Sequence, residues 1–319
     1  METVDIPHPR AGYAAQRANE KGGSSMYQMV TGSIVALVTP FHEDGSVNYG
    51  KLEEILEWHI ANGTDGILVL GTSGESSTLS HEEDAEVLKF TVKTVAHRLP
   101  VIAGSGSNCT QTAVDKSKEF EQLGADQLLV ITPYYNKATP LGMIRHFTTV
   151  AEAVKLPIIM YNVPGRTGCA LSEDTVKELS RIPNICGIKE ASGNISYATN
   201  IARYLDDQFV MYSGNDDMIT TIMALGGSGV ISVLANIAPQ QTHDIAADYL
   251  AGNVKKSLEG QLKYLDVIHD LFCEVNPVPV KEAMNLMGMG VGGYRLPLCE
   301  MTEAHRAQLA ASMKAAGLI

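Results

Sequence analysis

The stretch Ser33–Phe41 reads SIVALVTPF, and it decides between two folds that both alternate strands with helices. Its apolar residues are continuous rather than alternating, as is typical of a strand buried on both faces in a parallel sheet. An open doubly wound sheet usually carries a G-x-G-x-x-G turn after its first strand. Here the strand ends in Thr39-Pro40-Phe41. The sequence therefore favours a closed barrel, with the doubly wound sheet as the alternative.

Further apolar runs follow the first and alternate with amphipathic stretches. In one such stretch, Leu52, Ile55, Leu56 and His59 recur at helical spacing. Eight strands alternating with helices over about 220 residues suit a (β/α)8 TIM barrel, whose typical length is about 250 residues. The later strands are expected at Gly66–Leu70, Val101–Gly104, Leu128–Thr132, Pro157–Val163, Ile185–Glu190, Phe209–Gly214 and Gly229–Val233. Helices are expected between them at His81–Val95, Thr110–Leu123, Leu141–Val154, Ser172–Leu179 and Asp216–Leu225.

After Val233 only helical patterns remain, which predicts a helical appendage. We expect a catalytic barrel over residues 29–252 and a C-terminal helical domain over residues 253–319. Residues 1–28 carry small and charged side chains without an apolar segment, so they predict a leader or disordered extension rather than a secretory signal. The C-terminal helices are expected at Gln240–Ala251, Val254–Phe272, Val280–Met287 and Thr302–Ala316.

The charge balance of the 319-residue chain is acidic, with a formal net charge of −12. Phosphate binding needs clustered Lys and Arg, so this balance argues against nucleic acid or an anionic membrane surface as a partner. No apolar run approaches the ~20 residues that span a bilayer. The five cysteines are widely spaced and form no CxxC pair, so we expect reduced thiols in a cytoplasmic protein and no zinc site.

Lys189 is the candidate nucleophile, because it lies in the apolar run ICGIKE where a strand of the barrel should end. A buried ammonium is costly unless it is paired or loses its proton. Burial lowers a lysine pKa, and a neutral amine can attack a carbonyl carbon to form an imine. The alternative is a lysine that extends from the strand end into water. Lys281, in NPVPVKEAM, is the rival lysine and is interpreted as structural.

The loop Gly71–Ser76 (GTSGES) follows a buried run and is a candidate anion site. Its glycines let backbone N–H groups converge, and Thr72 and Ser73 add hydroxyl donors that suit a small carboxylate. The loop lacks the lysine and the spacing of a nucleotide-binding loop. The ordinary alternative is a Gly- and Ser-rich turn with no ligand.

Two tyrosines and one arginine complete the candidate site. Tyr135 and Tyr161 end the fourth and fifth strands, and a phenol near an imine can carry a proton, with the Thr72 hydroxyl as a bridge. Arg166 offers a planar fork that suits a second carboxylate. The alternatives are packing tyrosines and a surface arginine. HExxH and GxSxG motifs do not occur in the sequence, so zinc hydrolysis and a nucleophile elbow are not expected.

Six motifs, GTSGES, TPYYN, YNVPGRTG, GIKEASGN, YSGNDD and GVISVLAN, occur in this order. Together they resemble the dihydrodipicolinate synthase family of the N-acetylneuraminate lyase superfamily, from about Thr31 to the C-terminus. The resemblance implies a lyase that condenses pyruvate with L-aspartate 4-semialdehyde through a lysine Schiff base. The expected product is 4-hydroxy-tetrahydrodipicolinate, the first committed intermediate of diaminopimelate and lysine biosynthesis. It also implies no metal or organic cofactor, and a homotetramer built as a dimer of dimers.

The resemblance also implies catalytic roles. Lys189 matches the Schiff-base lysine of the family, and Tyr161 matches its general acid/base. Thr72 and Tyr135 match the other members of the proton relay, with Tyr135 reaching in from a neighbouring subunit. Ser73, with Thr72, matches the residues that hold the pyruvate carboxylate.

Further matches concern the second substrate. Arg166 matches the arginine that receives the semialdehyde carboxylate, and Gly214 and Ile231 match residues that line the pocket. The nearest alternative is N-acetylneuraminate lyase or a keto-sugar-acid aldolase, but such enzymes lack an arginine after YNVP, where this chain has Gly165–Gly168 (GRTG). A non-catalytic barrel that acts as a binding protein is the more distant alternative.

Some family members are inhibited by L-lysine, and the resemblance allows this site to be compared. Thr112 stands where lysine-sensitive members carry a glutamate, and Asp84 stands where they carry a second histidine. A threonine cannot offset the charge of a ligand ammonium, so we expect weak or absent inhibition by L-lysine. The matching positions are Ser76, Ser77, His81, Asn108 and Tyr134.

Overall fold

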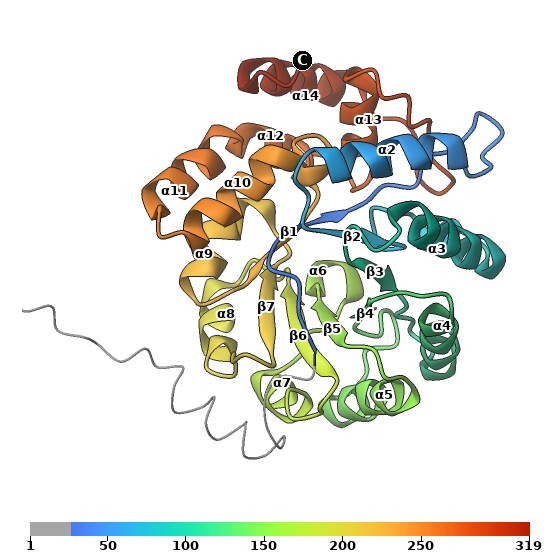
Figure 1. Cartoon of the computed structure of the whole chain (residues 1–319), viewed down its shortest axis with the longest axis vertical. Coiled ribbons are helices and arrows are strands. Elements are labelled where there is room, and N and C mark those ends of the chain that lie inside the picture. The colour runs from blue at the N-terminus through green and yellow to red at the C-terminus, as the bar shows by residue number, and fades with distance from the viewer. Residues whose placement is uncertain (1–26) are drawn as a thin grey trace, which may run out of the picture.

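A closed barrel of eight parallel strands forms the centre of the computed structural model, which describes residues 27–319. The strands pair in chain order, and β8 pairs with β1 to close the barrel. Helices surround the strands (Figure 1), so the predicted (β/α)8 barrel is confirmed. The strands are β1 Gly32–Ala36, β2 Gly66–Val69, β3 Val101–Gly104, β4 Gln127–Ile131, β5 Ile158–Asn162, β6 Ile185–Glu190, β7 Val210–Ser213 and β8 Gly229–Ser232.

The strands are buried on both faces, as their continuous apolar runs predict. In β2, Leu68 joins an apolar cluster inside the barrel with Ile34 and Ile231, whereas its neighbours Ile67 and Val69 pack in the cluster between strands and helices. Alternation along a strand sends successive side chains to opposite faces. Side chains on both faces of each strand are therefore mostly apolar, and the polar side chains of the site lie at the carboxyl ends of the strands.

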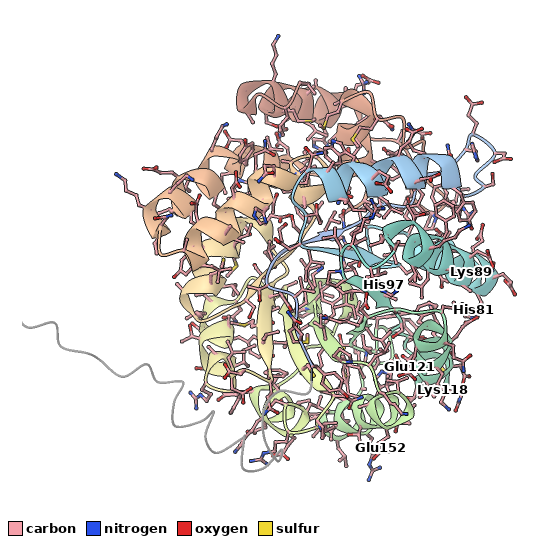
Figure 2. All side chains as sticks on the ribbon, viewed as in Figure 1. His81, Lys89, His97, Lys118, Glu121 and Glu152 are labelled. Carbon is pink, nitrogen blue, oxygen red and sulfur yellow. The ribbon has the colours of Figure 1, made fainter. Side chains whose placement is uncertain are left out.

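The surrounding helices are amphipathic. Exposed charged side chains such as Lys89, Lys118 and Glu152 cover their outer faces (Figure 2). Helix α3 begins with a capping box, in which the Ser80 side chain accepts from the Glu83 N–H and Glu83 accepts from the Ser80 N–H. The helices of the barrel are α2 Tyr49–Ala61, α3 His81–Val95, α4 Thr110–Gln122, α5 Pro140–Ala153, α6 Pro164–Thr167, α7 Glu173–Leu179, α8 Ile195–Ala202, α9 Ile219–Ala224 and α10 Pro239–Leu250.

Several predicted elements differ in the structure. The helix expected over Val254–Phe272 is two helices, because the Tyr264 N–H bonds Gln261 O three residues back and tightens the turn. The helix expected over Asp216–Leu225 begins as a 3₁₀ turn. Helices α6 and α8 were not predicted, although α8 carries a visible cap: the Asn194 side chain accepts from Tyr197 N–H.

The C-terminal helices are α11 Val254–Lys263, α12 Leu265–Asp270, α13 Val278–Leu286 and α14 Glu303–Ala316. Helix α11 packs on α10, and α14 packs on α12 and α13. The division at residue 252 stays a prediction. The predicted leader lies outside the described residues except for Tyr27 and Gln28, and the Tyr27 hydroxyl donates to Lys155 O at 2.7 Å. Within residues 27–319, no helix has the length and apolar character needed to cross a membrane.

Candidate active site

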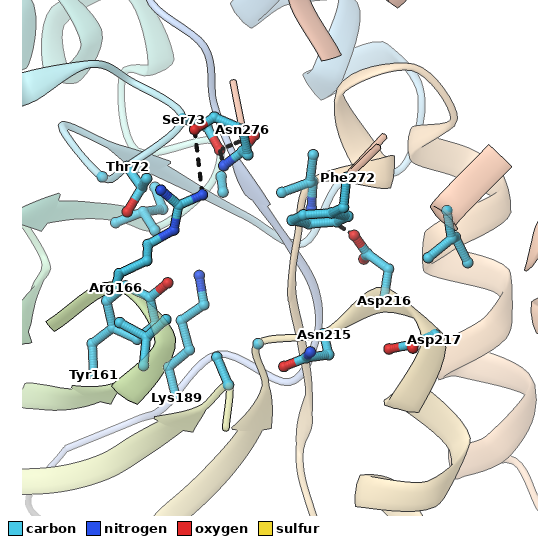
Figure 3. Close-up of a pocket in the computed structure, with 18 of the residues that line it drawn as sticks. Thr72, Ser73, Tyr161, Arg166, Lys189, Asn215, Asp216, Asp217, Phe272 and Asn276 are labelled. Carbon is cyan, nitrogen blue, oxygen red and sulfur yellow. Dashed lines mark hydrogen bonds between the residues drawn. The ribbon is translucent and has the colours of Figure 1, made fainter. Parts of the chain in front are cut away.

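Lys189 and Tyr161 are neighbours because their strands pair in register. β5 and β6 are hydrogen-bonded, and Tyr161 is the partner of Lys189 in that ladder. The Lys189 Nζ atom lies 4.4 Å from the centre of the Tyr161 ring. Both side chains are buried and point into the same cavity (Figure 3). Strand pairing alone thus brings the predicted nucleophile and the predicted proton carrier together.

The environment of Lys189 favours the neutral amine. Burial is the main cause that lowers the pKa of Lys189 to about 8; the carboxylate of Asp216 opposes this shift, and the positive charge of Arg166 contributes to it. At pH 7 about one tenth of such amines are neutral, against less than a thousandth for an ordinary lysine. This lysine is therefore able to act as a nucleophile near neutral pH.

The environment of Tyr161 favours the protonated phenol. Burial raises the pKa of Tyr161, while Arg166 and a hydrogen bond with Thr72 act in the opposite direction. The Tyr161 hydroxyl is thus a proton donor next to the amine, with the Thr72 hydroxyl as its partner. This is the arrangement that a proton relay to a carbinolamine needs.

Gly214 leaves the space that Lys189 occupies. A Cβ atom at this position would lie 3.1 Å from Lys189 Cε and 2.5 Å from Ala191 Cβ. The second distance is too short for two carbon atoms, and Ala191 Cβ is fixed to the backbone. A side chain at position 214 would therefore displace the wall against which the lysine stem lies.

Arg166 and Ser73 meet at one residue of the C-terminal region, Asn276. Arg166 Nη2 donates to Asn276 O at 3.3 Å, and Asn276 Nδ2 donates to Ser73 Oγ at 3.0 Å (Figure 3). Arg166 lies on the short helix α6, whose first residue is Pro164. Asn276 was not predicted as a site residue, because NPVPVK falls in the predicted C-terminal helical appendage. The available signal was a polar amide directly before the segment Pro277–Pro279, between two apolar helical stretches.

The cavity around Lys189 measures about 350 Å³ at the carboxyl ends of the strands. The predicted residues Thr72, Ser73, Tyr161, Arg166, Lys189 and Gly214 all line it. Their individual catalytic roles stay predictions. Residues that were not predicted also line it, among them Asn215, Asp216, Asp217, Ile268, His269, Phe272 and Asn276. The C-terminal helical appendage therefore contributes residues to the wall of the site.

Two predicted residues do not line this cavity. Ile231 is buried in the cluster inside the barrel, where Tyr161 also packs. Tyr135 is 87% exposed in the single chain and adopts a left-handed backbone, with φ +74°. A positive φ is unfavourable for tyrosine, so the backbone here is under strain. A large exposed aromatic ring is a common feature of surfaces that contact another protein.

A second cleft, of about 520 Å³, gathers most positions of the predicted lysine site. Asn108 is not among its lining residues. Asp84 lines the cleft but is buried and paired with Lys116, with Nζ 2.7 Å from Oδ2. The Asp84 carboxylate is therefore already neutralised within the chain. Of the predicted positions, those that line the cleft are Ser76, Ser77, His81, Thr112 and Tyr134.

Within residues 27–319, no three His, Cys, Asp or Glu side chains are grouped so that they could hold a metal ion. The five cysteines are free thiols. Cys186 is buried, whereas Cys109 and Cys299 are exposed.

A parallel barrel with a buried lysine amine and a phenol at its strand ends defines the class of barrel lyases that act through a lysine. Comparison with known proteins places the chain within that class. The model of the dihydrodipicolinate synthetase family matches residues 29–316. The chain belongs to this family.

Individual relatives agree with the family match. The chain is 53% identical to the 4-hydroxy-tetrahydrodipicolinate synthase of Lachnoclostridium phytofermentans, over 91% of this chain and 99% of that protein. The crystal structure of the chloride-inhibited dihydrodipicolinate synthase from Acinetobacter baumannii with pyruvate is similar, with a TM-score of 0.89 and 44% identity over 91% of this chain and all of that one. The crystal structure of the dihydrodipicolinate synthase from Cyanidioschyzon merolae with lysine bound is also similar, with a TM-score of 0.89. The two sequences are 38% identical, over 91% of this chain and 99% of that one.

Proposed function

We propose that this chain is a 4-hydroxy-tetrahydrodipicolinate synthase, which condenses pyruvate with L-aspartate 4-semialdehyde. The observation that carries the proposal is the Lys189 amine, which is buried beside Tyr161 and has a pKa lowered to about 8. The Thr72 and Ser73 hydroxyls of the loop Gly71–Ser76, called the anion loop below, lie on one side of this amine (Figure 3). Arg166 extends over the cavity (Figure 3). The names of the relatives and the pyruvate complex of one of them support the same reaction.

The reaction begins when the neutral Lys189 amine attacks the ketone carbon of pyruvate. Tyr161, relayed by Thr72, delivers the proton that lets water leave, which yields a protonated imine. This imine withdraws electrons, so the methyl group loses a proton and an enamine forms. The enamine carbon attacks the aldehyde carbon of the semialdehyde, whose carboxylate Arg166 receives. The amine of the adduct then attacks the imine carbon, closes the ring and releases Lys189.

The proposed enzyme is a homotetramer of two tight dimers, in which Tyr135 completes the site of the partner subunit. The support is apolar surface that a single chain leaves uncovered. Tyr135 is 87% exposed. Along α11, Val254, Leu258 and Leu262 form a stripe at four-residue spacing, exposed at 48%, 42% and 53%. Uncovered apolar stripes of this kind mark contacts between proteins. The cytoplasmic location stays a prediction.

A choice of aldehydes tests the proposal against its alternatives. The purified chain should consume L-aspartate 4-semialdehyde and pyruvate in an assay coupled to reduction of the cyclic product. Pyruvate with N-acetylmannosamine serves as the matched comparison. Faster turnover of the sugar aldehyde would replace the proposed function by that of a sugar-acid lyase. Absence of any turnover together with reversible pyruvate binding would indicate a binding protein.

A further inference from the structure

A fully buried ion pair links the C-terminal region to the anion loop. Lys281, on α13, and Glu75, in the loop after β2, have side chains exposed at 0% and 1%, and Lys281 Nζ lies 2.8 Å from Glu75 Oε1. The reaction mechanism uses neither group. Desolvation of two charges cancels most of their attraction, so a buried pair of this kind adds little net stability over apolar side chains. A role in fixing geometry explains it better.

The loop that holds Glu75 is under conformational constraint. Glu75 adopts φ +53°, in the left-handed region that is unfavourable for side chains other than glycine. It follows Gly74, where a Cβ atom would lie 3.0 Å from Leu70 N, so the loop is folded tightly onto the end of its own strand. Such a conformation persists when surrounding contacts hold it. The Glu75 carboxylate is where those contacts converge.

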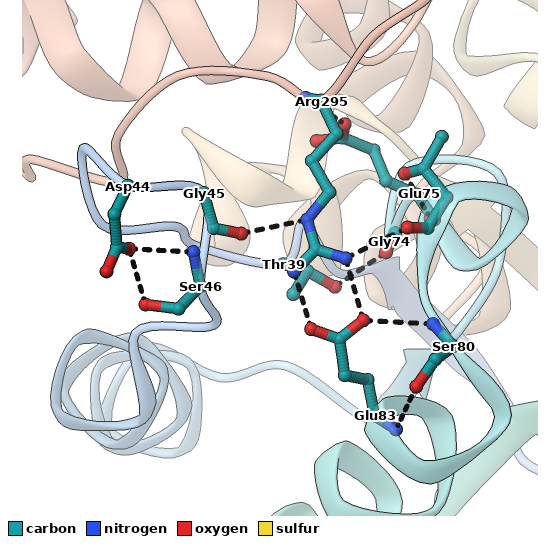
Figure 4. A network of polar contacts seen from close by, with 10 residues as sticks. Thr39, Asp44, Gly45, Ser46, Gly74, Glu75, Ser80, Glu83 and Arg295 are labelled. Carbon is teal, nitrogen blue, oxygen red and sulfur yellow. Dashed lines mark hydrogen bonds and ion pairs between the residues drawn. The ribbon is translucent and has the colours of Figure 1, made fainter.

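The contacts come from three segments that are far apart in the sequence. Lys281 Nζ also donates to Thr39 O at 3.0 Å, and Thr39 Oγ1 donates to Gly74 O at 2.6 Å. The second oxygen of Glu75 accepts from the backbone N–H of Arg295 at 3.4 Å. Figure 4 shows Glu75, Thr39 and Gly74 close to one another beside the Arg295 side chain. One ammonium thus joins the loops that follow β1 and β2.

A second clamp holds the same segment from the C-terminal side. The Nη1 and Nη2 atoms of Arg295 donate to the two carboxylate oxygens of Glu83, at 2.7 and 2.6 Å (Figure 4). Its Nε atom donates to Gly45 O at 2.8 Å. Glu83 caps α3, the helix that follows the anion loop. The start of α3 is therefore held independently of Lys281. Removal of Lys281 should loosen the loop without detaching that helix.

We propose that Lys281 is a positioning residue for pyruvate: by holding Glu75, it fixes the Thr72 and Ser73 hydroxyls that receive the pyruvate carboxylate. This inference rests on the proposed function and adds a determinant outside the cavity. Lys281 is not a second nucleophile, because its Nζ is engaged by Glu75 and Thr39 O and does not line the cavity. Lys281 acts through the conformation of the anion loop, and it affects the binding of pyruvate rather than that of the semialdehyde.

The test measures the pyruvate dependence of borohydride trapping at Lys189. In Lys281→Met the half-saturating pyruvate concentration should rise about tenfold or more, because the carboxylate loses preorganised donors. In Glu75→Gln the amide oxygen still accepts from Lys281, so the rise should be smaller, about threefold. The KM for L-aspartate 4-semialdehyde, measured at saturating pyruvate, should stay within about twofold because Arg166 is untouched.

A matched control separates loop positioning from lost stability. Leu309→Ala removes buried apolar volume from α14 and should lower the melting temperature without changing the pyruvate dependence. The double variant Lys281→Met/Glu75→Gln should recover part of the stability that Lys281→Met loses, since it leaves no unpaired buried carboxylate. The half-saturating pyruvate concentration of this double variant should stay as high as that of Lys281→Met. A rise in Leu309→Ala equal to that in Lys281→Met would overturn the proposal.

Failure of this inference is distinguishable from failure of the proposed function. If the unmodified chain traps no pyruvate, the Schiff-base function itself is wrong. If the unmodified chain traps pyruvate and Glu75→Gln shows the same pyruvate dependence, Lys281 and Glu75 are structural only. Glu75→Gln decides the question even if Lys281→Met does not fold.

Discussion

Lys189 Nζ lies 4.4 Å from the centre of the Tyr161 ring, and the two residues are direct partners in the β5–β6 ladder. Their approach follows from backbone pairing rather than from a flexible loop. The reacting centre is therefore rigid, as sites on strand ends are, and the parts that must be positioned are the loops around it. In the proposed mechanism, the loop after β2 and helix α6 receive the substrate carboxylates.

The pH dependence of imine formation should report the lowered pKa of Lys189. Only the neutral amine attacks, so kcat/KM for pyruvate should rise with pH up to about 8 and level off above it. Asp216→Asn should move the midpoint to lower pH, because the Asp216 carboxylate raises the pKa of Lys189. Arg166→Met should move it to higher pH. A profile that still climbs steeply beyond pH 9 in the unmodified chain would show an ordinary lysine.

Arg166→Ala should impair the second substrate more than the first. The guanidinium is exposed in the single chain, so its contact with the semialdehyde carboxylate is screened by water, and the loss should be about 1.5 kcal/mol. That corresponds to about tenfold in kcat/KM for the semialdehyde. Pyruvate trapping at a pH well above 8 should be nearly unchanged. An equal loss in both measurements would mean that Arg166 supports Asn276 and the loop instead.

Tyr135 should act in the site of a neighbouring subunit. When Tyr135→Phe and Lys189→Ala chains exchange subunits, each hybrid dimer contains one site with both residues intact and one with neither. Activity should therefore return on mixing two impaired proteins, and native mass spectrometry confirms the exchange. Tyr135→Phe mixed with unmodified chain is the control for dilution. Hybrids that form without recovered turnover would place Tyr135 in the site of its own chain.

Inhibition by L-lysine should be weak, with a midpoint at or above millimolar. Thr112 offers no charge to the ligand ammonium, and Asp84 is already paired with Lys116. Loss of one charge-assisted bond, ~1.5–3 kcal/mol, weakens binding about tenfold or more. Lys116→Ala frees the Asp84 carboxylate and should increase sensitivity, whereas the exposed Lys118→Ala on the same helix should not. A midpoint far below millimolar in the unmodified chain would contradict this account.

The barrel could be predicted from the sequence because a strand that is buried on both faces has a continuous apolar run. Lys189 could be singled out as a candidate for the same reason, since a lysine within ICGIKE must either lose its proton or extend from the buried strand into water. Each of these signals is local. Each strand is recognised from its own run of residues, and the candidate lysine from its place at the end of one such run, where barrels carry their chemistry.

Contacts between distant segments could not be predicted. Asn276 joins Ser73, which is 203 positions away, and Lys281 joins Glu75, 206 positions away. Neither contact changes the local pattern of the C-terminal helices, so this region resembled a separate appendage. The break at Tyr264 was missed because the apolar spacing continues through it. The exposure of the Tyr135 ring also leaves no mark on the local sequence pattern, because a tyrosine after a buried strand is as often buried as exposed.

The central claim is that Lys189 forms the imine with pyruvate, and peptide mass spectrometry after borohydride reduction tests it most directly. The unmodified chain should gain the mass of one reduced pyruvate on the peptide that contains Lys189. Lys189→Arg should gain none while it remains folded, because a guanidinium does not lose its proton at these pH values. A pyruvate adduct on the Lys189→Arg protein, or on the peptide that contains Lys281 in the unmodified chain, would contradict the account.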